Sequence, residues 1–326
     1  RGDDHLGGLL ADLLADAVHP AVEQLHHIRA VWPLALAYLV WKMMGYPKYD
    51  QAKAYLNDSF GRAKDDIVSD LSYFHRVWTD APLVVATNRD EALDRPSAPP
   101  RWRDGDPEVL APLDEQAGGT WMGASRRGLW VGLTNRRAGR NDPGLRSRGL
   151  LCRDLLDAAG AAEVVSCLES LEERYNPFHV VAADAERIVL VEYESGRADV
   201  RPLGSGCHVV TNRPADEHAE EPKARRVWRL LYDAGLWPAE RGGPAPDDLE
   251  ARLAAILGDH GSDGTDALCL HGERYGTRSA AIWRIAWPDG GSGEPGIRLA
   301  FAGGPPCTTP FEAVGERLVD GLDAPG

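Results

Sequence analysis

Cysteine is scarce in this sequence, and the few cysteines present form no close pairs. Five thiols stand at positions 152, 167, 207, 269 and 307 of 326 residues. An odd number of cysteines, with no Cys-x-x-Cys or Cys/His ligand spacing, argues against a disulfide framework and against a structural zinc site. We therefore expect reduced thiols, no bound metal ion and a reducing, cytoplasmic compartment.

Positive charge is also in short supply. Lys and Arg number 36 against 50 Asp and Glu, which gives a net charge of −14. A protein that binds nucleic acid normally shows a basic face, so we expect no nucleic-acid partner. Apolar residues still make up 43% of the chain, enough for a substantial core. The length allows one large domain or two small ones.

Lysine and arginine divide the chain into two unlike parts. Four of the five lysines precede residue 69, but only three of the 31 arginines do. We predict a helical segment of foreign composition over 1–68 and a main domain over 69–326. The longest uncharged run of the first part is AVWPLALAYLVW, at 30–41. It is shorter than the roughly 20 residues that span a bilayer, so it predicts either a packing helix or membrane-surface contact through 28–46.

From about residue 70 the pattern becomes α/β. Adjacent strands form hairpins, one of them around Arg126-Arg127-Gly128, and helices come in pairs between the strands. This order indicates stacked antiparallel sheets covered by helix pairs, an α/β/β/α layering. The Pro- and Gly-rich stretches 95–118 and 236–247 are expected to be exposed loops. We predict strands over 82–88, 119–125, 128–134, 178–183, 187–194, 207–212, 266–271, 278–287 and 297–302, and helices over 148–159, 161–174, 219–234 and 247–259.

Three predicted strands end in Asn and Arg. The segments are LVVATNRDE (83–91), WVGLTNRR (130–137) and CHVVTNRP (207–214), and Arg278 enters a fourth strand. Asn can donate to a developing oxyanion, and Arg can hold a carboxylate with two hydrogen bonds. Each residue could instead satisfy a turn or a surface ion pair. Gly118-Gly119 permits a close backbone approach, and Trp121 offers an apolar wall.

Several common catalytic motifs are missing. The sequence has no Gly-x-Ser-x-Gly elbow, no Gly-x-Gly-x-x-Gly turn between a predicted strand and a predicted helix, and no phosphate-binding P-loop. It therefore gives no motif support for an α/β-hydrolase, a dinucleotide enzyme or a P-loop nucleotidase.

Five segments occur together in the order typical of one family. They resemble the NRDE family, that of transport and Golgi organisation protein 2, over roughly residues 75–315, and nothing in 1–68 resembles it. The segments are NRDEALDRPSAPPRW (88–102), LDEQAGGTWMGASRRGLWVGLTNRR (113–137), VVTNRP (209–214), CLHGERYGTRSA (269–280) and PPCTTPFE (305–312).

The resemblance implies a fold and a set of site residues. The family is similar to N-terminal-nucleophile hydrolases, whose fold is a four-layer αββα sandwich. Carried over by motif, catalytic roles fall on Arg89, Asn212 and Arg278, and Ser69 stands where the N-terminal Cys of the family is expected. Ligand contacts are implied for Asn88, Asp90, Glu91, Trp121 and Asn135, with Asp90 or Glu91 orienting Arg89.

Two functions follow as hypotheses. The family link to haem trafficking and lipid homeostasis favours binding or trafficking of haem or an acyl lipid, with haem as cargo and no resident cofactor. The alternative is an amidohydrolase, which needs a free α-amine as base. An amide nitrogen inside a chain cannot serve, so this alternative requires cleavage before Ser69. Richness in Arg, Ala and Gly suggests a bacterial source.

Overall fold

The computed structural model describes residues 71–136, 141–215, 217, 221–237, 242–261, 266–288 and 293–317. All of them belong to the second of the two units into which the chain divides, Arg62–Gly326. The predicted helical segment 1–68, its membrane contact through 28–46 and Ser69 lie outside the described residues. The proposed boundary after residue 68 stays a prediction.

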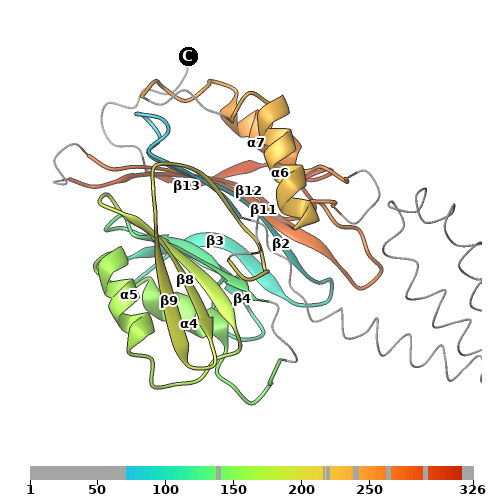
Figure 1. The fold of residues 1–326 in the computed structure, drawn as a ribbon. Coiled ribbons are helices and arrows are strands. Elements are labelled where there is room, and N and C mark those ends of the chain that lie inside the picture. The colour runs from blue at the N-terminus through green and yellow to red at the C-terminus, as the bar shows by residue number, and fades with distance from the viewer. Residues whose placement is uncertain are drawn as a thin grey trace, which may run out of the picture. The chain divides into compact units, whose positions relative to one another are not determined.

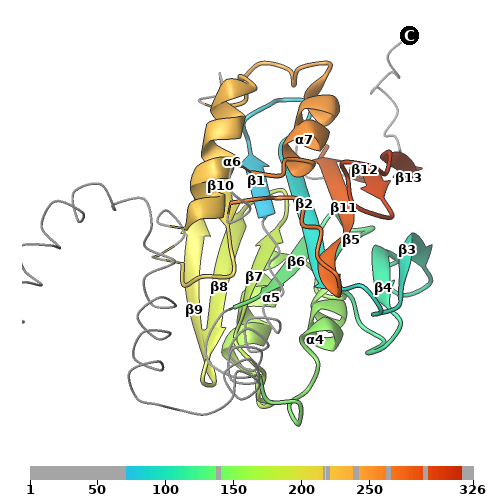
Figure 2. The ribbon, with the colours of Figure 1, turned by 90° about the vertical axis from the view of Figure 1, so that its right-hand side faces the viewer.

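Two antiparallel sheets form the centre of the described part, and the order of strands in the first can be followed in Figure 2. The first sheet has the order β10-β1-β2-β11-β12-β13 and the second β3-β4-β5-β6-β7-β8-β9. The first consists of β10 (Gly206–Val210), β1 (Leu71–His75), β2 (Leu83–Ala92), β11 (Tyr275–Ala286), β12 (Gly296–Ala302) and β13 (Glu312–Arg317). The second consists of β3 (Ser97–Arg103), β4 (Val109–Asp114), β5 (Met122–Ser125), β6 (Trp130–Asn135), β7 (Phe178–Ala183), β8 (Ile188–Glu194) and β9 (Arg197–Leu203).

Four helices of the described part lie on the outer faces of these sheets. Their arrangement can be followed in Figure 1. α6 (Pro222–Asp233) and α7 (Leu249–Leu257) lie on the first sheet. α4 (Arg148–Leu155) and α5 (Ala161–Glu169) lie on the second. The predicted αββα four-layer sandwich is thereby confirmed.

The core consists of three apolar layers, one between each pair of neighbouring layers. Val84 of β2 packs with residues of α6 and α7 on one side of the first sheet. Val85, the next residue, packs against Trp130 of the second sheet. Because successive side chains of a strand point to opposite faces, β2 is buried on both faces and reads as an unbroken apolar run.

Two sequence expectations about local structure were wrong. The stretch 95–118 is not an exposed loop, because it contains β3 and β4, and Leu110 is completely buried. Pro99 and Pro100 fit because β3 is an edge strand with a bulge between Ala98 and Arg101. The stretch 266–271 is not a strand, since the backbone N–H groups of Leu268 and Cys269 donate to the Asp259 carbonyl instead. The predicted hairpin around Arg126-Arg127-Gly128 is confirmed as β5–β6.

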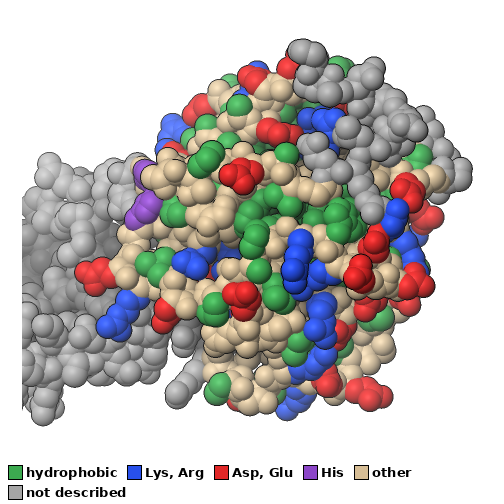
Figure 3. Space-filling model, turned by 180° about the vertical axis from the view of Figure 1, so that it is seen from behind, with side chains coloured by type: hydrophobic (Ala, Val, Ile, Leu, Met, Phe, Trp, Pro, Cys, Tyr) green, Lys and Arg blue, Asp and Glu red, His purple; other side chains and the backbone are tan. Residues whose placement is uncertain are grey.

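Charge is mixed over the visible surface. On the face in Figure 3, basic and acidic side chains lie interspersed, with hydrophobic side chains between them. Within the ranges described above, no helix is both long and apolar enough to cross a membrane. The absence of a nucleic-acid partner and a cytoplasmic location stay predictions.

Candidate ligand-binding pocket

The alternation of side chains along β2 decides which polar residues face the second sheet. Leu83 and Val85 point into the layer between the sheets, and Arg89 and Glu91 continue on that face. Both are buried, at 5% and 7% exposure. The charges at the end of this core strand therefore lie between the two sheets, at the edge of the apolar layer.

These two residues line a cavity of about 380 Å³. Trp121 and Asn135 reach it from the second sheet, and Arg148 reaches it from the first turn of α4. The structure thus brings together four predicted site residues, Arg89, Glu91, Trp121 and Asn135. The remaining lining residues are Arg95, Asp114, Gln116, Ala117, Thr120, Leu133, Asp142, Pro143, Leu145, Arg146, Ser147, Gly149 and Asn176.

Arg89 has an incomplete set of partners. Its guanidinium carbon lies 4.2 Å from the centre of the Trp121 ring, and its Nη2 lies 3.6 Å from Glu91, beyond good hydrogen-bonding distance. Its Nη1 is buried and has no hydrogen-bond partner among the described residues. Burial lowers the pKa of Arg89, although Glu91 and Asp114 oppose that shift. The group remains a cation with unused hydrogen-bonding capacity.

Arg148 is the second cation of this kind. Its Nη1 donates to the Pro177 carbonyl at 2.8 Å, and no carboxylate of the described residues pairs with it. Burial, with a further contribution from Arg95, lowers the pKa of Arg148 to about 10. Two guanidinium groups without a full counter-charge therefore line one cavity.

The two other arginines of the described lining, Arg95 and Arg146, are neutralised locally. Arg95 forms two hydrogen bonds with Asp114, at 2.6 and 3.2 Å. Burial favours the neutral form of Asp114, but the bonds from Arg95 outweigh it and leave the pKa of Asp114 below its usual value. Arg146 pairs with Asp154 at 2.6 Å and Glu173 at 3.1 Å. Among the arginines of the described lining, Arg89 and Arg148 are the exceptions.

A backbone contact holds the two halves of the cavity wall together. The N–H of Thr120 donates to the Gly149 carbonyl at 2.9 Å. A Cβ atom on Gly119 would lie 2.2 Å from the carbonyl carbon of Gly149, so only glycine fits there. Gly118 has a φ of +72°, which also favours glycine. The predicted close approach at Gly118-Gly119 is confirmed, and it places Trp121 beside the start of α4.

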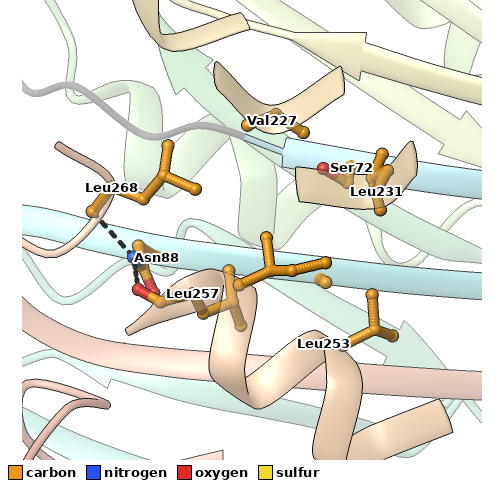
Figure 4. A pocket seen from close by; sticks show the side chains of 9 residues that line it. Ser72, Asn88, Val227, Leu231, Leu253, Leu257 and Leu268 are labelled. Carbon is orange, nitrogen blue, oxygen red and sulfur yellow. Dashed lines mark hydrogen bonds between the residues drawn. The ribbon is translucent and has the colours of Figure 1, made fainter. Parts of the chain in front are cut away.

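Asn88 and Asp90 lie on the opposite face of β2. Asn88 donates from Nδ2 to the carbonyls of Leu257 and Leu268, at 2.9 and 2.8 Å (Figure 4). The space beside it is only about 10 Å³. Asp90 accepts a 2.6 Å bond from Thr277 and lies 3.5 Å from Lys223. The structure does not bring Asn88 or Asp90 together with Arg89, and of the two acids expected to orient Arg89, only Glu91 is close to it.

Asn212 and Arg278 lie outside the cavity lining. Asn212 follows β10, is 2% exposed, and its Nδ2 has no hydrogen-bond partner among the described residues. Arg278 is near enough to Arg89 to contribute to lowering its pKa, and its Nη2 lies 3.5 Å from the Arg95 carbonyl. Their catalytic roles stay predictions, as does that of Ser69.

The cavity offers no metal-binding set. Among the described residues its lining contains no Cys or His, and Glu91 and Asp114 already face arginines. Among the described residues, thiol and imidazole groups close enough to hold a metal ion occur elsewhere, at His260, Cys269, His271 and Cys307.

Arg148 was missed by sequence reasoning. It follows Ser147, whose side chain accepts from the Gly149 N–H and begins α4. This N-cap predicts a helix start but not what the next side chain faces. The close approach of Gly119 to Gly149, which arises only in the folded chain, brings that helix start to the cavity.

Comparison with known proteins identifies the family. Residues 72–286 match the family model described as Transport and Golgi organisation 2. The chain belongs to this family. Its members include the mouse Transport and Golgi organization 2 homolog, 35% identical over 230 residues, and the human protein homolog, 37% identical over 234 residues. Each of these alignments covers 61% of this chain and 80% of the relative.

One solved structure with a similar backbone is the Caenorhabditis elegans ortholog of N-acylethanolamine-hydrolyzing acid amidase. It is 14% identical, covers 66% of this chain and 91% of its own, and has a TM-score of 0.46. The family resemblance expected from the sequence is confirmed by the family model. The bacterial source stays a prediction.

Proposed function

We propose that this protein binds an organic carboxylate in the cavity between its two sheets. The observation that carries the proposal is the pair of cations, Arg89 and Arg148, that line one cavity without full counter-charge. Removing a charge from water without pairing it costs several kcal/mol, so a ligand that supplies the missing charge gains much of that energy back.

The surroundings of the two cations suit a carboxylate with an apolar body. A guanidinium can hold a carboxylate through two parallel hydrogen bonds, and Arg89 has an unused N–H group for this purpose. The α4 N-terminus, where Arg148 stands, also favours negative charge. Trp121 and Leu133 provide apolar contact in the same lining.

An acyl chain fits this lining better than haem. Haem carries propionate carboxylates, and an acyl lipid carries a carboxylate when its chain is a free fatty acid. Haem iron also needs an axial ligand, commonly His or Cys, and the lining offers neither. We therefore favour an acyl carboxylate as the ligand and lipid binding or trafficking as the role, with haem as the second ligand of the same class.

The test is calorimetric titration with decanoate and, separately, with hemin. We expect Arg89→Met and Arg148→Met each to weaken decanoate binding at least tenfold, because each removes one cation but keeps a long side chain. The matched control is Arg127→Met, since Arg127 is an exposed arginine that pairs with exposed Asp106 and does not line the cavity. Equal affinity for decanoate in the unmodified protein and the three variants would refute the proposal. Binding of hemin but not of decanoate would reassign the ligand.

Amide hydrolysis is the second candidate, on a different observation. Leu71 of β1 is paired with Val210 on one side and Thr87 on the other. The start of β1 therefore lies at the end of the sheet where Asn212 follows Val210 and Arg89 follows Thr87. The buried, unbonded Nδ2 of Asn212 is a candidate oxyanion donor there.

Intact-mass measurement with N-terminal sequencing tests this candidate. A chain that begins at Ser69 would have the free amine that the chemistry needs, and Ser69→Ala should then abolish amidase activity. A protein that keeps residue 68 attached to Ser69 would have no such base, and the hydrolase candidate would be rejected.

A further inference from the structure

Four metal-ligating side chains meet in one place away from the cavity. His260, Cys269, His271 and Cys307 each offer one ligand atom, and the four atoms all lie within 4.8 Å of one another. Cys269 Sγ is 3.5 Å from Cys307 Sγ and 3.6 Å from His271 Nε2. His271 Nε2 is 3.1 Å from Cys307 Sγ. None of the four residues lines the cavity.

These separations are close to the edges of a zinc tetrahedron. With Zn–S near 2.3 Å and Zn–N near 2.0–2.1 Å, tetrahedral angles require S···S of about 3.8 Å and S···N of about 3.6 Å. The three distances among Cys269, His271 and Cys307 differ from these values by at most about 0.5 Å. A disulfide has a different geometry, with sulfurs about 2.05 Å apart. The thiols are therefore placed for a shared ligand rather than for a bond to each other.

The ligands come from three segments that the fold brings together. His260 follows α7, Cys269 and His271 precede β11, and Cys307 lies between β12 and β13. Close Cys/His spacing in the sequence does not indicate this cluster, because 36 positions separate His271 from Cys307 and the two side chains meet only in the folded chain.

The backbone around the ligands is fixed by other bonds. The Asp259 carbonyl accepts from the N–H groups of Leu268 and Cys269, at 2.9 and 2.8 Å. The Asp259 carboxylate holds Arg226 through two bonds of 2.9 and 2.8 Å. Leu270 donates from its N–H to Thr277 Oγ1 at 2.8 Å. These bonds hold the ligand-bearing segments in position, which lowers the ordering cost of binding an ion.

We propose that His260, Cys269, His271 and Cys307 form a Zn²⁺ site. Two thiolates and two imidazoles in a tetrahedral arrangement are a donor set typical of zinc. With four protein ligands no coordination position stays open, so the ion is structural rather than catalytic. It would cross-link the end of α7, the start of β11 and the loop between β12 and β13.

The first measurement is the zinc content of the purified full-length protein, after one equivalent of Zn²⁺ is added and excess is removed. We expect one zinc per chain. With Co²⁺ as probe, we expect the intense visible bands of tetrahedral cobalt and a thiolate-to-cobalt charge-transfer band. Cys307→Ser, Cys269→Ser and His271→Ala should each weaken zinc binding about 100-fold or more. They should also remove or change the charge-transfer band.

Matched controls show whether an effect is specific to this site or follows from the removal of any thiol or imidazole. Cys167→Ser removes an exposed cysteine of α5, and His208→Asn removes a histidine of β10. Both should keep one zinc and the full cobalt spectrum. If Cys269→Ser fails to fold, His260→Ala and Cys307→Ser alter ligands that are not fully buried and serve instead.

Three results would overturn the proposal. The first is less than a tenth of an equivalent of zinc in the protein exposed to Zn²⁺. The second is a cobalt spectrum without thiolate charge transfer. The third is a Cys269–Cys307 disulfide in the protein purified without reductant, shown by peptide mapping, that persists when Zn²⁺ and a mild reductant are supplied. None of these results depends on ligand binding at Arg89.

Discussion

The guanidinium of Arg89 lies over the ring of Trp121, with its central carbon 4.2 Å from the ring centre. Arg89 belongs to β2 of the first sheet, and Trp121 stands immediately before β5 of the second. This contact joins the two sheets where the apolar layer gives way to the cavity. It also leaves one N–H group of the arginine available to a ligand.

The Arg89–Trp121 contact should be measurable as a coupling energy. We expect a double-mutant cycle of Arg89→Met and Trp121→Leu, followed by urea unfolding, to give a coupling of about 0.5–2 kcal/mol. Trp121→Phe keeps an aromatic face and should therefore keep part of the coupling energy. A coupling of zero, with the fold intact by circular dichroism, would contradict the interaction.

Gly119 should be much less tolerant of substitution than a glycine in open space. A Cβ at Gly119 meets the backbone of Gly149, which cannot move aside as a side-chain end can. We expect Gly119→Ala to lower the free energy of unfolding by roughly 2–4 kcal/mol and to weaken ligand binding.

Gly204→Ala is the control for this prediction, since nothing lies within 4 Å of its Cβ. Gly118→Ala has open space but a φ of +72°, so it should cost about 1–2 kcal/mol. Equal stability of the Gly119→Ala and Gly204→Ala proteins would show that the contact is not tight in solution.

Asn88 should contribute to stability without contributing to ligand binding. Its side chain satisfies two carbonyls, those of Leu257 and Leu268, in a buried layer. Asn88→Ala leaves both carbonyls without this donor, and we expect a loss of about 2–4 kcal/mol in chemical denaturation. The affinity for decanoate, measured below the unfolding transition, should change less than twofold. A tenfold weaker affinity would place Asn88 in the site after all.

Glu192 should make the protein sensitive to acid. Its carboxylate lies 2.9 Å from His179 Nε2 and accepts the Ala215 N–H at 2.8 Å. The contact with His179 is the largest cause that lowers the pKa of Glu192, from 4.5 to about 2. Because the folded-state pKa is depressed, the stabilisation is fully present above pH 4.5 and is lost as the pH falls through about 2.

The comparison that tests this is Glu192→Gln against the unmodified protein, by denaturation at several pH values. We expect the variant to be less stable by about 1–3 kcal/mol at pH 7. The difference should shrink between pH 4.5 and about 2. A difference that does not depend on pH would rule out the carboxylate charge as its cause.

Much of the fold and part of the site could be predicted from the sequence. Hairpin spacing and paired helices predicted the four layers that the structure shows. The Asn-Arg-Asp-Glu motif predicted a site at the end of a buried strand. The same motif led to a wrong grouping of side chains, because the alternation of side chains along the strand was not considered. Asn88 and Asp90 were placed with Arg89 and Glu91, although neighbouring side chains of a strand point to opposite faces.

The sequence by itself determined the strand that carries Arg89, the glycine needed at position 119 and the family. Local periodicity, backbone sterics and motif order are properties of short segments, so they can be read without the fold. Only the tertiary structure decided that Arg148 shares a cavity with Arg89, and that His260, Cys269, His271 and Cys307 meet. Those relationships join segments far apart in the chain, and they depend on how sheets and loops pack rather than on any local pattern.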